Sequence, residues 1–175
     1  NPFVKASSVY NQELMYMYKN SYFLQISDSY TKDATTQVPL QRTIKNSDGE
    51  NVKELRYIRT NYGSENNFSV NLGMNKNFFN QIWTANYVLG LQVNSFKGTV
   101  DTDPITGEKF APFHADGSMT TPFLQLSNNI RLSSKKDWFL GVNYFYLGKQ
   151  RIDLGILDPI SSLDFSVKKI WNDFT

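Results

Sequence analysis

The chain contains no cysteine and only one histidine, His114, among its 175 residues. Without cysteine there is no disulfide framework, no thiol nucleophile and no thiolate-ligated zinc or iron–sulfur site. One histidine excludes a metal site built from several histidines, and a Ser–His–Asp triad could form only with His114 as its base. We therefore expect no catalytic residues, no metal site, no cofactor and no enzymatic activity.

Charge and long apolar runs are also scarce. Charged residues make up 19% of the chain and the formal net charge is +2, too little for the concentrated basic face that nucleic acid requires. No stretch of 18 apolar residues exists, which excludes a transmembrane helix. The mean hydropathy of −0.44 still permits a membrane β-barrel, because barrel strands alternate apolar and polar residues.

A period-two alternation of apolar and polar residues dominates the chain, and aromatic residues reach 15%. In residues 82–96 one face carries Trp83, Ala85, Tyr87, Leu89, Leu91 and Val93, and the other carries Thr84, Asn86, Val88, Gly90, Gln92 and Asn94. Such a run is long for a soluble strand and suits a tilted membrane strand of about 10 residues. The pattern predicts about seven strands, roughly at 8–18, 21–33, 55–76, 80–97, 118–133, 137–150 and 161–171.

Short and long connections alternate between these strands. Short turns are predicted at 19–20, 76–81 and 133–137, and long loops at about 33–54, 97–117 and 150–160. Outer-membrane barrels have this asymmetry, with short periplasmic turns and long outer loops. We therefore predict an all-β protein whose antiparallel up-and-down meander forms part of a large transmembrane outer-membrane β-barrel. Bacterial single-chain barrels use an even number of strands, so we expect 1–175 to be one segment of a barrel whose plug and remaining strands lie elsewhere.

The alternation also assigns candidate residues to two environments. Polar side chains of the alternating strands are candidates for the barrel lumen: Asn71, Thr84, Asn86, Gln92, Asn94, Arg131, Asn143, Asp164 and Lys168. Aromatic side chains near strand ends are candidates for the membrane–water boundary: Tyr22, Trp83, Trp138 and Trp171. The alternative interpretation places both sets in an ordinary soluble sheet, as exposed polar residues and as packed rings.

Several segments resemble the barrels of Bacteroidetes TonB-dependent receptor-like proteins. The opening Asn1-Pro2-Phe3-Val4-Lys5 is followed by Asn11, Glu13-Leu14 and a Tyr-rich hairpin, as in that family. Asn61-Tyr62-Gly63 leading into 68–72, and the stretch 163–169, are also similar to segments of these barrels. The match departs at Ala6-Ser7, where the family has Pro-Glu, and at Thr175, where completed barrels end on an aromatic residue.

The resemblance implies a solute importer in the outer membrane of a Gram-negative bacterium. Members of the family take up siderophores, vitamins, or oligosaccharide or peptide fragments, driven by the TonB complex. The implied partners are outer-membrane lipid, the protein's own plug domain, the TonB system and a surface lipoprotein. Loops 33–54 and 97–117 are the candidates for contact with cargo or a surface partner.

The predicted loop at 97–117 holds the other residues with potential chemistry. His114 lies near Asp103 and Glu108, but Pro104 and the spacing argue against a calcium loop. Asp103 to Gly107 and Asn46 to Gly49 are predicted to be turns. Two further functions stay open: a soluble β-sandwich or small barrel that binds carbohydrate or lipid, and a hydrolase that uses His114 with a serine. The hydrolase lacks a G-x-S-x-G nucleophile elbow.

Overall fold

The computed structural model describes residues 4–133, 135, 137–152 and 155–171, and every regular element in these ranges is a β-strand. The strands are β1 (Ser8–Tyr18), β2 (Tyr22–Lys45), β3 (Asn51–Phe78), β4 (Trp83–Thr102), β5 (Lys109–His114), β6 (Gly117–Arg131), β7 (Trp138–Leu147), β8 (Gln150–Ile152), β9 (Gly155–Leu157) and β10 (Ile160–Lys169). Within the described ranges no helix is long and apolar enough to cross a membrane.

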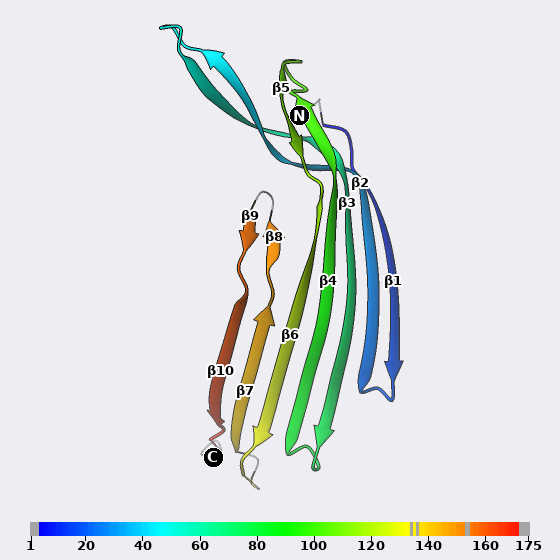
Figure 1. Cartoon of the computed structure of the whole chain (residues 1–175). Helices are drawn as coiled ribbons and strands as arrows, with labels where there is room; N and C mark the ends of the chain where they lie inside the picture. The colour runs from blue at the N-terminus through cyan, green and yellow to red at the C-terminus, as the bar shows by residue number, and fades with distance from the viewer. Residues whose placement is uncertain (1–3, 134, 136, 153–154, 172–175) are drawn as a thin grey trace. The chain divides into compact units, whose positions relative to one another are not determined.

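One sheet contains eight of the strands, in the order β1-β2-β3-β4-β6-β7-β10, with β5 paired to β2 and β4 (Figure 1). β8 and β9 form a separate two-stranded sheet. Each of the predicted strands corresponds to one member of the main path, and consecutive members are neighbours as in a meander. The antiparallel all-β prediction is confirmed. The soluble sandwich is not supported, because these strands form one sheet instead of two sheets packed face to face.

Two of the short connections are sharp turns, as predicted. Lys19 and Asn20 have φ angles of 50° and 49°, the positive values that a two-residue type I′ hairpin requires. Phe79, Asn80 and Gln81 have φ angles of 52°, 52° and 64° between β3 and β4. Asparagine tolerates this left-handed region better than most residues, which explains its presence in both turns.

The chain divides into two compact units. The strand unit comprises Glu13–Ser27, Phe68–Val93 and Thr120–Thr175. The hairpin unit comprises Asn1–Gln12, Asp28–Asn67 and Asn94–Met119. Strands β1, β2, β3, β4 and β6 contribute residues to both units.

Strand register separates two faces in the strand unit. Leu126 of β6 and Leu163 of β10 both lie opposite Tyr144 of β7, and Ser127 lies opposite Asn143. Residues in register share a face, and successive residues of a strand alternate between faces. The leucines and Tyr144 therefore lie on one face of the sheet, and Ser127 and Asn143 lie on the other.

The hairpin unit has a buried apolar core. Its members come from β2, β3, β4 and β5 and the start of the following loop: Ala34, Val38, Leu40, Ile58, Tyr62, Val100, Phe110 and Ala115. Leu40 and Val38 are fully buried. Burial of these side chains on one face of each strand holds the long extensions of β2, β3 and β4 together.

The connections predicted as long loops are largely strands, and this part of the prediction was wrong. Segment 33–54 holds the extensions of β2 and β3, segment 97–117 holds the end of β4 and all of β5, and segment 150–160 holds β8 and β9. Val38 and Leu40 do occur at alternate positions, but Pro39 between them weakens the strand signal because proline has no N–H to donate. Burial in the hairpin-unit core outweighs this weak local preference.

The tip of the β2–β3 hairpin is the turn predicted at Asn46 to Gly49. The side-chain oxygen of Asn46 accepts hydrogen bonds from the backbone N–H of Asp48 at 3.0 Å and of Glu50 at 2.8 Å. Gly49 has a φ of 82°, which glycine adopts without steric cost. The Asn side chain thus replaces a backbone acceptor and fixes the turn.

The Asn61-Tyr62-Gly63 motif lies where backbones approach closely. The Asn61 side-chain amide donates to the carbonyl oxygens of Lys5 at 3.1 Å and Asp33 at 2.5 Å, and its oxygen accepts from the Lys5 N–H at 2.7 Å. Asp33 has a φ of 53°, so its carbonyl leaves the regular ladder. A Cβ on Gly63, which has a φ of 146°, would lie 2.8 Å from the Cα of Gly98. The motif therefore joins three segments of the hairpin unit.

Candidate functional site

The apolar face of the strand unit carries many exposed large side chains, above all on β1, β4 and β10. Its large side chains include Leu14, Tyr16, Leu72, Leu89, Leu91, Leu163, Phe165 and Val167, each more than half exposed. An exposed apolar surface of this extent is unusual in a water-soluble protein and is typical of a surface that contacts lipid or protein. In a β-barrel it is the outward band that faces the bilayer.

Asn128 is a polar residue on this apolar face, and its hydrogen bonds explain its presence there. It lies opposite Val142 in the β6–β7 register, with Ile130 and Leu126 on either side. Its Oδ1 accepts from Trp83 Nε1 at 3.0 Å and from the Tyr87 hydroxyl at 2.6 Å, and its amide donates to the Val142 carbonyl at 3.2 Å. The polar atoms of both rings are thus satisfied within the face. The sequence marks this residue only as an interruption of the apolar pattern.

Lysine ammonium groups lie close to aromatic rings near the short connections of the strand unit. The Lys169 ammonium lies 5.0 Å from the centre of the Trp138 ring and 5.6 Å from that of Trp171. The Lys76 ammonium lies 5.7 Å from the Tyr22 ring. These distances permit cation–π attraction, and lysine beside aromatic rings suits the layer of lipid headgroups.

Trp83 follows the 79–82 turn and stacks on Phe78 with ring centres 4.7 Å apart. The four predicted boundary aromatics thus all lie beside short connections or just beyond the last strand. Their position at a membrane boundary stays a prediction.

The predicted lumen residues occupy the opposite face. Asn71, Thr84, Asn86, Gln92, Arg131, Asn143, Asp164 and Lys168 belong to the strand unit, and Asn94 belongs to the hairpin unit. The Asn71 amide donates to Gln25 at 3.5 Å, Thr84 donates to Asn77 at 2.7 Å and Asn143 accepts from Ser127 at 2.7 Å. The result is a wall of mainly hydroxyl and amide groups that also carries the charged Arg131, Asp164 and Lys168, and its role as a lumen stays a prediction.

Two glycines on the polar face accommodate aromatic rings that the sequence analysis did not assign to it. A Cβ on Gly73 would lie 2.0 Å from the Phe23 ring, and a Cβ on Gly90 would lie 2.5 Å from the Phe123 ring. Each ring therefore covers a glycine on a neighbouring strand, an arrangement that protects the backbone and fixes strand register. Glycine within a strand was the available signal for these contacts.

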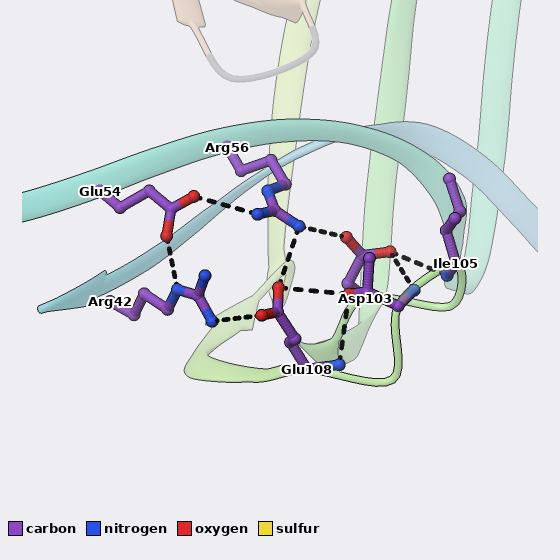
Figure 2. A network of polar contacts seen from close by, with 7 residues as sticks. Arg42, Glu54, Arg56, Asp103, Ile105 and Glu108 are labelled. Atoms are coloured by element: carbon purple, nitrogen blue, oxygen red, sulfur yellow. Dashed lines mark hydrogen bonds and ion pairs between the residues drawn. The ribbon is translucent and has the colours of Figure 1, made fainter. Parts of the chain in front are cut away.

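A network of arginines and carboxylates occupies the hairpin unit (Figure 2). Arg42 of β2 contacts Glu54 at 2.5 Å and Glu108 at 2.9 Å. Arg56 of β3 contacts Glu54 at 3.0 Å, Asp103 at 3.0 Å and Glu108 at 3.1 Å. The guanidinium groups of Arg42 and Arg56 lie 5.0 Å and 5.5 Å from the centre of the Phe110 ring. The network thus fixes the β4–β5 hairpin to β2 and β3.

Asp103 anchors this network because it is only 2% exposed. Its Oδ1 accepts from the backbone N–H of Ile105 at 2.8 Å, and its carbonyl accepts from the Gly107 N–H at 2.8 Å. The predicted 103–107 turn is therefore confirmed. A calcium loop at this position would use the Asp103 carboxylate as a ligand, but this carboxylate forms an ion pair with Arg56.

The carboxyl groups of the network titrate below their ordinary range. Hydrogen bonds from Arg42, and then from Arg56, lower the pKa of Glu54, and a hydrogen bond from Arg42 lowers the pKa of Glu108. Burial acts to raise the pKa of Asp103, but hydrogen bonds from the Ile105 backbone and from Arg56 outweigh it and lower that pKa. All three groups are charged at neutral pH, which the ion pairs require.

His114 is an exposed residue of β5 whose Nδ1 lies 3.1 Å from the Thr99 hydroxyl. In the described part of the chain no group of three or more histidine, aspartate or glutamate side chains could hold a metal ion. The absence of catalytic and metal-binding residues stays a prediction.

Sequence reasoning did not find Arg42, Glu54 and Arg56 as a group, although they flank the Asn46 to Gly49 turn, which brings β2 beside β3.

An antiparallel meander with one exposed apolar face and one polar face is the wall of a transmembrane β-barrel. The model of the Outer membrane protein beta-barrel family matches residues 1–173, and the chain belongs to this family. The protein is therefore a barrel protein of the Gram-negative outer membrane. Comparison with curated proteins and with solved structures finds no match.

Proposed function

We propose that this chain is one arc of a larger barrel that imports a solute across the outer membrane, in the manner of TonB-dependent receptors. The observation that carries the proposal is the polar face, which offers hydroxyl and amide groups opposite the apolar face. A wall of this composition suits a wet interior, because uncharged donors and acceptors bind many solutes weakly. The resemblance of Asn61-Tyr62-Gly63 and of the opening hairpin to TonB-dependent receptor-like barrels supports the transport role.

The need for further strands follows from the sheet edges. β1 and β10 are the ends of the strand order, and each has one edge without a partner among the described residues. Open edges are not tolerated in the hydrocarbon region, because unpaired N–H and C=O groups there cost several kcal/mol each. We infer that additional strands pair with β1 and β10 in the membrane and close a barrel of larger circumference.

In this proposal the β2–β3 and β4–β6 connections face the extracellular side, since short turns of such barrels face the periplasm. A plug inside the barrel contacts the polar face, and the TonB complex supplies the energy that moves the plug. A surface lipoprotein would contact the hairpin unit. These partners come from the family resemblance.

The proposal is tested by uptake in the native bacterium. A strain that lacks the gene is compared with its parent for uptake of labelled ferric siderophore, cobalamin, oligosaccharide and peptide, each with and without a protonophore. Loss of one cargo in the deletion strain, and loss of the same cargo by the parent under the protonophore, is the expected result. Equal uptake by both strains for every cargo would contradict import, and protonophore-insensitive uptake would indicate a passive pore.

The barrel size is tested separately on the native polypeptide extracted from outer membranes. A species several-fold heavier than 20.2 kDa, with gel mobility that changes on boiling, is expected for one arc of a large barrel. A heat-modifiable species of 20.2 kDa would contradict the larger barrel.

A further inference from the structure

On the apolar face of the strand unit, the charged residues among the described strands of the main sheet are lysines. Lys76 follows Leu72 and Met74 at alternate positions of β3, and Lys169 lies opposite Trp138 in the β7–β10 register. Both lysines are near the short connections, where their strands end. Cations at the margin of a lipid-facing surface are placed for contact with lipid headgroups, because the stem of a lysine can lie along apolar surface while its ammonium reaches the polar layer.

The acidic residues on the described strands of this unit lie on the polar face. Asp164 is opposite Asn143 in the β7–β10 register. Glu13 accepts a hydrogen bond from the Gln25 amide at 2.7 Å, and Gln25 in turn accepts one from the Asn71 amide at 3.5 Å. The described strands of the unit therefore place no carboxylate beside the lysines on the apolar face.

The two lysines differ in whether their charge is already neutralised. Lys169 forms an ion pair with Asp137, whereas Lys76 forms none with any described residue. Lys76 donates a hydrogen bond to the Tyr22 hydroxyl at 3.4 Å, and its ammonium lies 5.7 Å from the centre of the Tyr22 ring and 5.4 Å from that of Phe78. An ammonium group has three N–H donors, so Lys76 can bind an anion and keep this contact.

A second lysine without an ion pair among the described residues lies beside the same aromatic cluster. The ammonium of Lys19, in the turn between β1 and β2, is 5.1 Å from the centre of the Tyr18 ring. The Tyr18 and Tyr22 ring centres are 6.4 Å apart. The Asn75 N–H donates to the Ser21 carbonyl oxygen at 2.7 Å, which holds this turn against the end of β3. Two cations without a bound carboxylate therefore lie beside one pair of tyrosine rings.

We propose that Lys19 and Lys76, together with the Tyr22 hydroxyl, bind the phosphate group of an anionic phospholipid. Lysine forms charge-assisted hydrogen bonds with phosphate oxygens, and the Tyr22 O–H can donate to the same group while its oxygen accepts from Lys76. The occupant is a lipid because these cations border the apolar face, where acyl chains contact residues such as Leu72. The site is independent of solute import, since it requires only the barrel wall in a membrane.

The test is native mass spectrometry of the native polypeptide in detergent, titrated with phosphatidylglycerol or with phosphatidylcholine of the same acyl chains. Tighter binding of phosphatidylglycerol, which carries a net negative charge, is expected. K76Q and K19Q should each weaken its binding about fivefold, and K19Q/K76Q about 25-fold, because each lysine near an anionic lipid surface contributes a factor of roughly five. K19Q leaves the apolar face unchanged, so it tests the site even if K76Q does not fold, and the gel mobility of unboiled samples reports folding of each variant.

The matched control is K168Q, because Lys168 is an exposed lysine on the polar face of β10, opposite Phe139. It removes the same charge, and its affinity for phosphatidylglycerol should stay within about twofold of the parent. The proposal is overturned if phosphatidylcholine binds as tightly as phosphatidylglycerol, if K19Q binds like the parent, or if K168Q weakens binding as much as K76Q. Displacement of the lipid by an excess of inorganic phosphate would also overturn it, since the site would then recognise a soluble anion.

Discussion

Asn128→Ala should destabilise the barrel wall by leaving two ring donors on the apolar face without their acceptor. In the native chain Asn128 Oδ1 accepts from Trp83 Nε1 at 3.0 Å and from the Tyr87 hydroxyl at 2.6 Å. On a surface that faces hydrocarbon the Tyr87 hydroxyl has no water as a substitute, whereas Trp83, at its predicted boundary position, lies closer to water. The cost is therefore the loss of both hydrogen bonds and the desolvation of the Tyr87 hydroxyl.

The magnitude follows from hydrogen-bond energetics in membranes. Interhelical side-chain hydrogen bonds there average about 0.6 kcal/mol, while a donor left unsatisfied costs about 1–3 kcal/mol. For the Trp83 and Tyr87 donors together we expect Asn128→Ala to lower the free energy of unfolding by about 1–3 kcal/mol. Tyr87→Phe removes one donor along with its hydrogen bond, so its loss should be at most half as large.

The assay is reversible urea unfolding of the native polypeptide in lipid vesicles, followed by far-ultraviolet circular dichroism. Asn129→Ala is the matched control, because Asn129 is the next residue of β6, is exposed and lies on the polar face opposite Gly141. Its free energy of unfolding should stay within about 0.5 kcal/mol of the parent. If Asn128→Ala is no less stable than Asn129→Ala, the assignment of Asn128 to a lipid-facing hydrogen-bond cluster is refuted.

Four further predictions concern the hairpin unit and are read by hydrogen–deuterium exchange, corrected for the intrinsic chemical rate. Because the pKa of Asp103 is lowered in the folded protein, the ionised Asp103 stabilises the fold at pH values above its ordinary pKa of 3.8, and this stabilisation is lost as the pH falls through the lowered pKa. Exchange of the backbone amides in 102–109 should therefore be flat from pH 8 to 5 and rise only below about pH 4. In Arg56→Gln that exchange should already be fast at pH 7, and equal protection in variant and parent would contradict the network's role. Gly98→Ala should increase amide exchange where β3 and β4 pair, because the added Cβ would lie 1.7 Å from the carbonyl oxygen of Tyr62. Unchanged protection of these amides would refute the close approach of the two strands. Leu40→Ala removes a fully buried side chain and should cost the hairpin unit about 2–5 kcal/mol, with a cost below 1 kcal/mol arguing against a packed core.

The alternation of side chains was sufficient to predict the main strands and their two faces. In residues 82–96 the period of two is nearly unbroken, because each strand must present apolar residues on one side only. The Lys19-Asn20 hairpin was also predictable, since its turn is local and asparagine favours it. These features depend on neighbouring residues and need no knowledge of the rest of the fold.

The hairpin unit could not be predicted in the same way. Val38 and Leu40 are strand residues because they are buried against Ile58 and Val100, which are far away in the sequence. Arg42 and Arg56 converge on Glu108 only after β2, β3 and the β4–β5 hairpin have come together. Tertiary burial and long-range ion pairs decide this part of the structure, and the local pattern of a polar, proline-containing segment is typical of a loop.

Asn128 shows both the value and the limit of pattern reading. Its position on the apolar face follows from the alternation, so the sequence alone identifies it as an exception. The polar residue is needed at this position because the Trp83 N–H and the Tyr87 O–H of β4 require a hydrogen-bond acceptor. Only the register of the strands brings Trp83 and Tyr87 to it.

The most direct test of the two-faced barrel wall uses the absence of cysteine in this chain. Leu89→Cys on the apolar face and Asn86→Cys on the polar face of β4 are each labelled with a small fluorophore in the native polypeptide, with the unsubstituted parent as the labelling control. After reconstitution into vesicles, a nitroxide attached to lipid acyl chains should quench the label at position 89 strongly and the label at position 86 weakly, and aqueous iodide should show the opposite order. Equal quenching at both positions, or the reverse order, would contradict the account.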